Sequence, residues 1–185
     1  MAKADILRPF ILSWEGGFSN VKGDRGGATN KGITLATYKA LCRVDNNHDG
    51  KIDDKDLKLL TEAQWLSIFK KSFWDRWKAD RITNQSIANL LVDWTWNSGT
   101  YGIKEPQKVL GVVADGIVGE KTLAAINGYK DQSGLFKKLW LARQKYYIEQ
   151  SKKKDQSQFL KGWLNRLNGI KYGSLWNGNK LINRF

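Results

Sequence analysis

Apolar residues recur every three or four positions through most of this 185-residue chain, and only two prolines interrupt them. This spacing places apolar side chains on one face of a helix, whereas strands alternate every second residue. Proline inside a helix removes a hydrogen bond and clashes with the preceding turn, so its scarcity favours helices. With 41% hydrophobic and 26% charged residues, the composition is that of a globular protein. The sequence therefore predicts a mainly α-helical fold.

The first helix and the segment after it differ in composition. An apolar stripe runs through residues 6–14, with Asp5 as its expected N-cap, and the helix is predicted to end at Glu15. Six glycines then crowd residues 16–32, which are too turn-rich for a helix. We therefore expect a small β-hairpin directly after the first helix.

Caps and glycine breaks predict where the later helices begin and end. Thr34 is the expected cap of the helix at residues 35–42. Thr61 and Gln64 have the spacing of a capping box and predict a helix through Phe73. The other predicted helices run from Asn84 or Ser86 to Gly99, and over residues 105–112, 119–127, 133–150 and 157–167.

Positive charge is concentrated toward the C-terminal end of the chain. The chain has 31 Lys and Arg against 18 Asp and Glu, and residues 129–185 hold 13 of the basic and 3 of the acidic residues. A surface of this sign attracts polyanions, such as nucleic acid, anionic cell-wall polymers or a membrane surface. The run Lys152, Lys153 and Lys154 is either a solvated helix end or part of that basic surface.

The single cysteine, Cys42, and the single histidine, His48, exclude several kinds of chemistry. No disulfide forms within the chain, and zinc sites with three or four His and Cys ligands are impossible. A Ser-His-Asp triad would have to recruit His48. The sequence has no glycine-rich phosphate loop, and no organic cofactor is expected. Carboxylates are thus the acid and base groups that an enzyme of this composition would use.

Residues 45–56 follow the pattern D-x-N-x-D-G-x-x-D-x-x-D and resemble an EF-hand calcium loop. Oxygen side chains fall at positions one, three, five and nine, and Gly50 permits the sharp turn. The last position is Asp, whereas Glu is usual there, and the shorter side chain reaches less far toward a bound ion. The alternative is an acidic turn whose side chains bond their own backbone. We expect a structural Ca²⁺ held by Asp45, Asn47, Asp49, the carbonyl of Lys51, Asp53 and Asp56.

Glu15 has the surroundings expected of a catalytic acid. It follows Trp14 at the end of an apolar helix and precedes two glycines, so its carboxyl would be partly desolvated beside space for a ligand. Desolvation favours a protonated carboxyl, which can donate its proton to a leaving glycosidic oxygen. Asp24, in the expected hairpin, would stay ionised. Glycoside hydrolysis requires two carboxyls in unlike environments, and Glu15 and Asp24 would meet this requirement. The alternative interpretation is that Glu15 is a surface residue at a helix end.

Residues 14–34, WEGGFSNVKGDRGGATNKGIT, resemble the signature E-G-G-[YF]-S-N…D-x-G-G-x-T-N-x-G-I-T of the family 108 glycoside hydrolases, bacterial and phage N-acetylmuramidases. The resemblance implies a lysozyme-like helical fold and a catalytic Glu15. A looser similarity to the Glu…Asp…Thr arrangement of phage-type lysozymes matches Asp24 and Thr29, although Thr29 lies one residue nearer to the Asp. This similarity implies that Asp24 stabilises charge or activates water, and that Thr29 positions the water.

Three further segments extend the resemblance. DWTWNSG at residues 93–99 is similar to the family's helix ending in Asn-x-Gly, with Trp96 in place of a smaller residue. Asp115, Gly116, Gly119 and Thr122 match a signature of peptidoglycan-binding modules, and residues 159–167 resemble the family's closing helix. The resemblance implies a catalytic lobe at residues 1–100, with an insertion at 45–56, and a peptidoglycan-binding-like helical lobe at 101–185 packed on it.

Nine Trp, six Tyr and seven Phe suit a sugar polymer as ligand, because aromatic faces pack on pyranose rings. Most of these residues lie on helical stripes and are expected in the core, as for Trp65, Phe69, Phe73 and Trp140. Substrate contacts are instead expected from donors in the loop at 26–30 and from residues beside the break at Gly99. The predicted substrate-binding residues are Gly26, Gly27, Asn30, Trp96, Asn97 and Tyr101.

The resulting hypothesis is a monomeric muramidase that cleaves the β-1,4 bond between N-acetylmuramic acid and N-acetylglucosamine of peptidoglycan. The alternatives are a lytic transglycosylase acting on the same bond, a non-catalytic cell-wall-binding module and a nucleic-acid binder. The N-terminus lacks the apolar core of a signal peptide, and no apolar run is long enough for a membrane helix. We therefore expect release to the wall by a holin-type or other non-Sec route.

Overall fold

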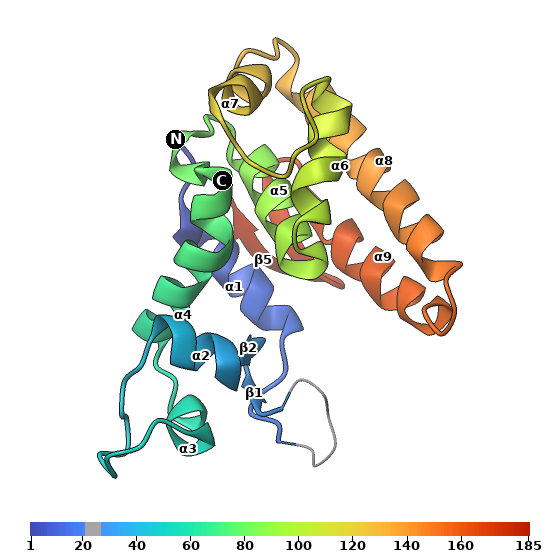
Figure 1. The fold of residues 1–185 in the computed structure, drawn as a ribbon. Coiled ribbons are helices and arrows are strands. Elements are labelled where there is room, and N and C mark those ends of the chain that lie inside the picture. The colour runs from blue at the N-terminus through green and yellow to red at the C-terminus, as the bar shows by residue number, and fades with distance from the viewer. Residues whose placement is uncertain (21–26) are drawn as a thin grey trace. The chain divides into compact units, whose positions relative to one another are not determined.

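The computed structural model describes residues 1–20 and 27–185, which form two compact units. One unit comprises Ile11–Ser72, and the other comprises Met1–Phe10 together with Phe73–Phe185. Helix α1 (Ala4–Trp14) contributes to both. Helices predominate in the chain, and the sheets are small and antiparallel, which confirms the predicted fold class (Figure 1). None of the described helices is long and apolar enough to cross a membrane.

The described residues of the unit Ile11–Ser72 form a β-hairpin and three complete helices, besides the end of α1 and the first residues of the π-helix that follows Phe69. Strands β1 (Thr29–Asn30) and β2 (Ile33–Thr34) pair antiparallel, with Thr29 opposite Thr34, and confirm the predicted hairpin. The helices that follow are α2 (Leu35–Leu41), α3 (Asp54–Lys58) and α4 (Glu62–Phe69).

Local capping explains where α2 and α4 begin. The Thr34 hydroxyl accepts the Thr37 N–H at 3.2 Å. Thr61 and Gln64 exchange side-chain-to-backbone hydrogen bonds, as in a capping box. Both predicted caps are therefore confirmed. The prediction that Asp5 caps α1 is wrong, because α1 already begins at Ala4 and Asp5 lies inside its first turn.

Aromatic packing forms the core of this unit. The rings of Trp65 and Phe69 stack with their centroids 5.1 Å apart, and both side chains are buried, as is Tyr38. Trp65 Nε1 donates to the Lys31 carbonyl at 2.9 Å, which satisfies the indole N–H and ties α4 to the hairpin. The predicted core positions of Trp65 and Phe69 are confirmed.

The second unit contains most of the helices and the end of the chain. The π-helix η1 (Lys70–Trp74) leads into it from α4. Its further helices are η2 (Asp75–Trp77), η3 (Ala79–Arg81), α5 (Gln85–Ser98), α6 (Tyr101–Leu110), α7 (Glu120–Asn127), α8 (Gln132–Ser151), η4 (Ser157–Phe159) and α9 (Leu160–Asn168).

Helix α5 lies at the centre of this unit, since residues 86–95 are all buried. Helices α6 and α8 pack against it (Figure 1). The helix begins at the cap Asn84, whose Oδ1 accepts the Ile87 N–H, and ends at Gly99 with φ +55°. A Cβ at Gly102 would lie 2.5 Å from the Thr95 backbone, so glycine permits the close approach of α6.

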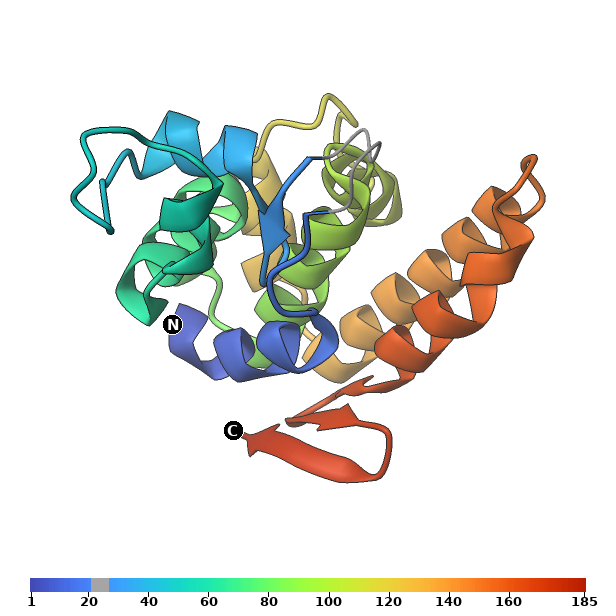
Figure 2. The same cartoon turned by 90° about the horizontal axis from the view of Figure 1, so that it is seen from below.

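The end of the chain forms a sheet that the helical patterning did not predict. Helices α8 and α9 run side by side, and a small sheet follows them (Figure 2). Strands β3 (Ile170–Lys171), β4 (Ser174–Asn177) and β5 (Lys180–Arg184) pair antiparallel in sequence order. Asn183 Nδ2 donates to the Ile6 carbonyl of α1 at 3.2 Å, so the sheet covers the first residues of the chain.

The compact units follow the packing of helices, and they do not coincide with the predicted lobes. The predicted division at residue 100 separates a catalytic lobe from a peptidoglycan-binding-like lobe, and it stays a prediction.

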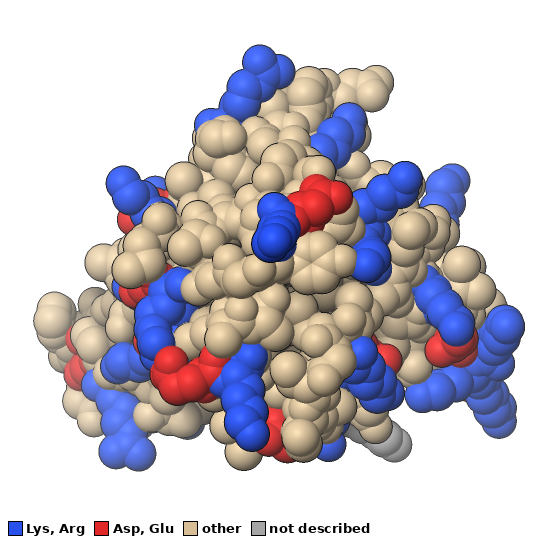
Figure 3. All heavy atoms as spheres, turned by 90° about the horizontal axis from the view of Figure 1, so that it is seen from above, with Lys and Arg blue, Asp and Glu red and all other residues tan. Residues whose placement is uncertain are grey.

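The excess of basic residues is visible on the surface, where Lys and Arg side chains are spread over the face drawn in Figure 3 and acidic side chains are fewer. This face can therefore attract anionic polymers at long range.

Candidate functional site

Glu15 lies just beyond the last residue of α1, with its side chain partly buried. Its backbone N–H donates to the Leu12 carbonyl at 3.4 Å, which continues the last turn of the helix. Gly16 and Gly17 are exposed, and a Cβ built on either would meet no atom of the described residues within 4 Å, apart from their chain neighbours. Among the described residues, the backbone of these two glycines is therefore not crowded, and a ligand beside Glu15 stays a prediction.

The hairpin is bonded to the segment that follows Glu15. Ser19 and Thr29 exchange two backbone hydrogen bonds of 2.8 Å. This bridge fixes Thr29, which is partly buried, opposite Ser19, and Ser19 lies four residues along the chain from Glu15. Gly27 precedes it with φ +64° and is exposed. The predicted residues Asp24 and Gly26 lie outside the described residues.

The Asn30 side chain links the hairpin to the end of α3 through hydrogen bonds. Its side chain is 5% exposed, and Nδ2 donates to the carbonyls of Leu57 at 2.8 Å and Lys58 at 3.2 Å. Both amide protons thus join the hairpin to the end of α3. The predicted substrate contact of Asn30 stays a prediction, and the side-chain donors are already engaged.

The other predicted sugar-binding residues surround the break between α5 and α6. Trp96 packs on Phe73, with ring centroids 4.6 Å apart. Asn97 is exposed and donates through Nδ2 to the Asp93 carbonyl at 2.9 Å. Tyr101 is 60% exposed, and its ring centroid lies 6.3 Å from that of Tyr146. Asn97 and Tyr101 thus have accessible surface for a ligand, while Trp96 is partly covered.

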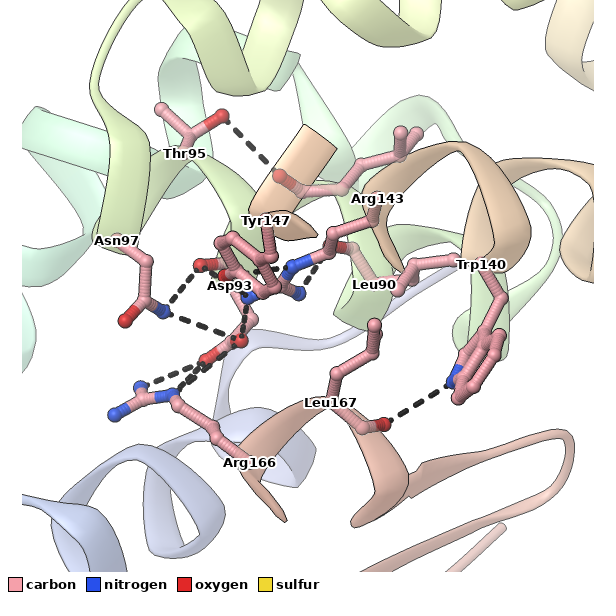
Figure 4. Close-up of polar contacts among 10 residues, drawn as sticks. Leu90, Asp93, Thr95, Asn97, Trp140, Arg143, Tyr147, Arg166 and Leu167 are labelled. Carbon is pink, nitrogen blue, oxygen red and sulfur yellow. Dashed lines mark hydrogen bonds and ion pairs between the residues drawn. The ribbon is translucent and has the colours of Figure 1, made fainter. Parts of the chain in front are cut away.

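A buried ionic network lies directly beneath Asn97 and was not predicted from the sequence. Asp93 is fully buried and accepts from Arg143 Nη2 at 2.7 Å and from Arg166 Nη2 at 2.7 Å. Figure 4 shows its carboxylate between the two guanidinium groups. The Tyr147 hydroxyl accepts from Arg143 Nη2 at 2.7 Å. The network therefore joins α5, α8 and α9.

Electrostatics keep this network ionised. Burial opposes the charge of Asp93, but Arg166 and Arg143 together hold the pKa of its carboxyl below the ordinary value. Burial also raises the pKa of Tyr147, which remains a neutral hydroxyl beside Arg143. The spacing of α8 signals this arrangement, because Arg143 falls on a buried stripe of every fourth residue: Leu135, Leu139, Arg143, Tyr147 and Ser151.

In the loop at residues 45–56, side-chain oxygens bond backbone amides. Asp45 accepts the N–H groups of Asp49 at 3.2 Å and Gly50 at 2.8 Å. Asp56 is buried and accepts those of Asn46 at 2.7 Å and Asp53 at 2.9 Å. The Asp53 N–H, opposed by desolvation, holds the pKa of the Asp56 carboxyl below its usual range.

The remaining predicted ligands of this loop have similar partners. Asn47 and Asp49 are joined by a 3.1 Å hydrogen bond, Lys55 pairs with Asp49 at 3.3 Å, and Asp53 caps α3. Lys51 is exposed. In the part of the chain that the structure describes, no three His, Cys, Asp or Glu side chains gather closely enough to hold a metal ion. The binding of Ca²⁺ by these residues stays a prediction, and no catalytic step is assigned to a cation.

The Asp115–Thr122 segment is held together by one buried side chain, Gln107. Its Oε1 accepts the Gly116 N–H at 2.9 Å, and its Nε2 donates to Asp115 Oδ1 at 3.0 Å. Asp115 also accepts the Ile117 N–H at 2.8 Å. Asp115 and Gly116 of the signature therefore shape this loop, while the Ile117 side chain is 71% exposed at its surface.

Comparisons with known proteins agree with the sequence patterns. Residues 8–99 match Glycosyl hydrolase 108, and residues 101–168 match a predicted peptidoglycan domain. No curated protein sequence is significantly similar to this chain. The solved structure of Brucella abortus SagA is 30% identical, covers 88% of both chains and superposes with a TM-score of 0.68. These matches support a glycoside hydrolase that acts on peptidoglycan, and the chain belongs to the glycosyl hydrolase 108 family.

Proposed function

We propose that this chain is an N-acetylmuramidase and that Glu15 is its general acid. The bond cleaved would be the β-1,4 link between N-acetylmuramic acid and N-acetylglucosamine. The observation that carries the proposal is the position of Glu15 at the end of α1, beside two glycines with no atom of the described residues within 4 Å of a Cβ, apart from their chain neighbours. Neither glycine carries a side chain that would stand between a sugar chain and the backbone beside Glu15.

In this mechanism Glu15 protonates the bridging oxygen while positive charge develops at the muramic acid carbon. Asp24 would stabilise that charge or activate the attacking water, as the resemblance to phage-type lysozymes implies. Thr29 would position the water. The two hydrogen bonds between Ser19 and Thr29 support this role, because they fix the hairpin strand to the segment that leaves Glu15.

The test is the variant Glu15→Gln, which keeps the size of the side chain and removes its acidic proton. We expect the release of reducing ends from purified peptidoglycan to fall about 10²- to 10⁴-fold, the usual contribution of general acid catalysis. Circular dichroism should be unchanged. Glu62→Gln, an exposed position in the same unit, is the control and should keep full activity. Wild-type activity of Glu15→Gln would show that another group supplies the proton.

A further inference from the structure

A groove of about 380 Å³ lies within the second unit, between the end of α5, the end of α8 and α9. This volume falls in the range of small-ligand sites, about 300 to 1,000 Å³. Its lining combines aromatic rings, neutral amides and two lysines. All lining residues belong to the unit Phe73–Phe185, whereas Glu15 belongs to the other unit.

Five aromatic rings form a continuous strip, and three of them, Tyr146, Tyr147 and Trp163, line the groove. Trp163 of α9 stacks on Tyr147 at 5.4 Å and on Phe159 at 6.0 Å. Tyr146 follows at 5.9 Å from Tyr147, and Tyr101 of α6 at 6.3 Å from Tyr146. The ends of the strip are open, since Phe159 is 47% and Tyr101 is 60% exposed. Tyr146 and Trp163 are both partly exposed where they line the groove, so their rings suit a ligand with apolar faces, such as a chain of pyranose rings.

The floor of the groove is rigid. Tyr147 is only 3% exposed, and its hydroxyl accepts from Arg143 Nε at 3.0 Å and Nη2 at 2.7 Å. Asn97 at the rim is bonded to Asp93, which binds the same arginine. A site whose side chains are already fixed loses little conformational entropy when a ligand binds.

Two lysines give one end of the groove a positive charge. Lys153 and Lys154 follow α8 and line the groove, and both are exposed. Lys153 Nζ donates to Gln150 Oε1 at 2.6 Å, a neutral partner that holds the ammonium group at the groove and leaves its charge available to an anion. Asp155 in the same turn offsets one of the three positive charges at residues 152–154.

From this arrangement we infer that the groove binds a segment of an amino-sugar glycan that carries a carboxylate. Sugar rings lie along Tyr146 and Trp163, and the carboxylate pairs with Lys153 and Lys154. The inference rests on the proposed function, which makes peptidoglycan the substrate. The carboxylate has two possible sources there, the free lactyl group of N-acetylmuramic acid and the stem peptide attached to it.

Calorimetry on Glu15→Gln protein tests the inference without turnover. The ligands are a peptidoglycan disaccharide with a free lactyl carboxylate, the same disaccharide with its stem peptide, neutral chitotetraose and a single-stranded oligonucleotide. We expect at least one carboxylate-bearing ligand to bind more tightly than chitotetraose. Of the two carboxylate-bearing ligands, the one that binds more tightly identifies the source of the carboxylate.

The lysines are tested with the double variant Lys153→Ala/Lys154→Ala. It should lose about tenfold or more in affinity for that ligand, as expected for a lost charge-assisted contact, and little for chitotetraose. The control Lys137→Ala/Lys180→Ala removes the same charge from exposed positions outside the groove and should bind normally. Unchanged affinity of the groove variant, or tightest binding of the oligonucleotide, would overturn the inference. Reducing ends released by the Glu15→Gln protein itself would instead refute the proposed catalytic role.

Discussion

Replacing Asp93 by Asn should lower the free energy of unfolding by about 3 to 5 kcal/mol, the cost of breaking a buried ion pair. Asp93 and Arg143 are fully buried, and the Arg166 side chain is 8% exposed. The substitution leaves two guanidinium groups without their shared negative charge. Arg143 keeps the Tyr147 hydroxyl and the Leu90 carbonyl, at 3.3 Å, as acceptors, which places the expected loss toward the lower end.

The same value follows from the individual contacts. Two charge-assisted hydrogen bonds of 2.7 Å are lost or weakened, and each contributes about 1.5 to 3 kcal/mol. Urea unfolding should be followed by both tryptophan fluorescence and circular dichroism, because the chain has two compact units and a single transition must be demonstrated.

The matched control is Glu120→Gln. Glu120 pairs with Arg81 through contacts of 2.6 and 2.7 Å in the same unit, but both side chains are largely exposed. Exposed pairs contribute little to stability because solvent screens them, so this variant should unfold near the wild-type midpoint. If Asp93→Asn were no less stable than Glu120→Gln, the network would not stabilise the fold as argued.

Three further predictions concern stability. Because the pKa of Asp93 is lowered in the folded state, its contribution to the free energy of unfolding is present above the unfolded carboxyl pKa of about 3.9. This contribution is lost as the pH falls through the pKa of the folded state. Acid titrations should show the loss in the wild type but not in Asp93→Asn. Gly102→Ala should cost about 1 to 3 kcal/mol by overpacking against Thr95, whereas Gly162→Ala, with no atom within 4 Å, should be neutral or stabilising in thermal melts. Calcium should raise the melting temperature of the wild type if residues 45–56 bind it, and Asp45→Asn should abolish that rise; an unchanged wild-type melt would refute the calcium prediction.

Local signals predicted the elements that depend on neighbouring residues. Thr34, Thr61 and Gln64 cap their helices as the sequence indicates, because a cap is formed within three residues. The glycine-rich segment after Glu15 gives the expected hairpin. The position of Glu15 at the end of α1 follows from the same local pattern.

Features that depend on distant residues were missed. The C-terminal sheet has short strands, and its best sequence signal is Asn177-Gly178, a turn-forming pair between β4 and β5. The carboxylate of Asp93 meets Arg166 across 73 positions of sequence, and no spacing rule identifies such a pair. In the loop at 45–56 the carboxylates of Asp45 and Asp56 accept backbone N–H groups, and the calcium site that the sequence pattern indicates there stays a prediction.

The most direct test of the proposed function is the chemical nature of the sugar ends released from purified peptidoglycan, determined by mass spectrometry. We predict fragments that end in reducing N-acetylmuramic acid, produced by the wild type and almost absent with Glu15→Gln. Fragments ending in anhydro-muramic acid would indicate a lytic transglycosylase. Reducing N-acetylglucosamine ends would place the cleavage at the other glycosidic bond and contradict the proposal.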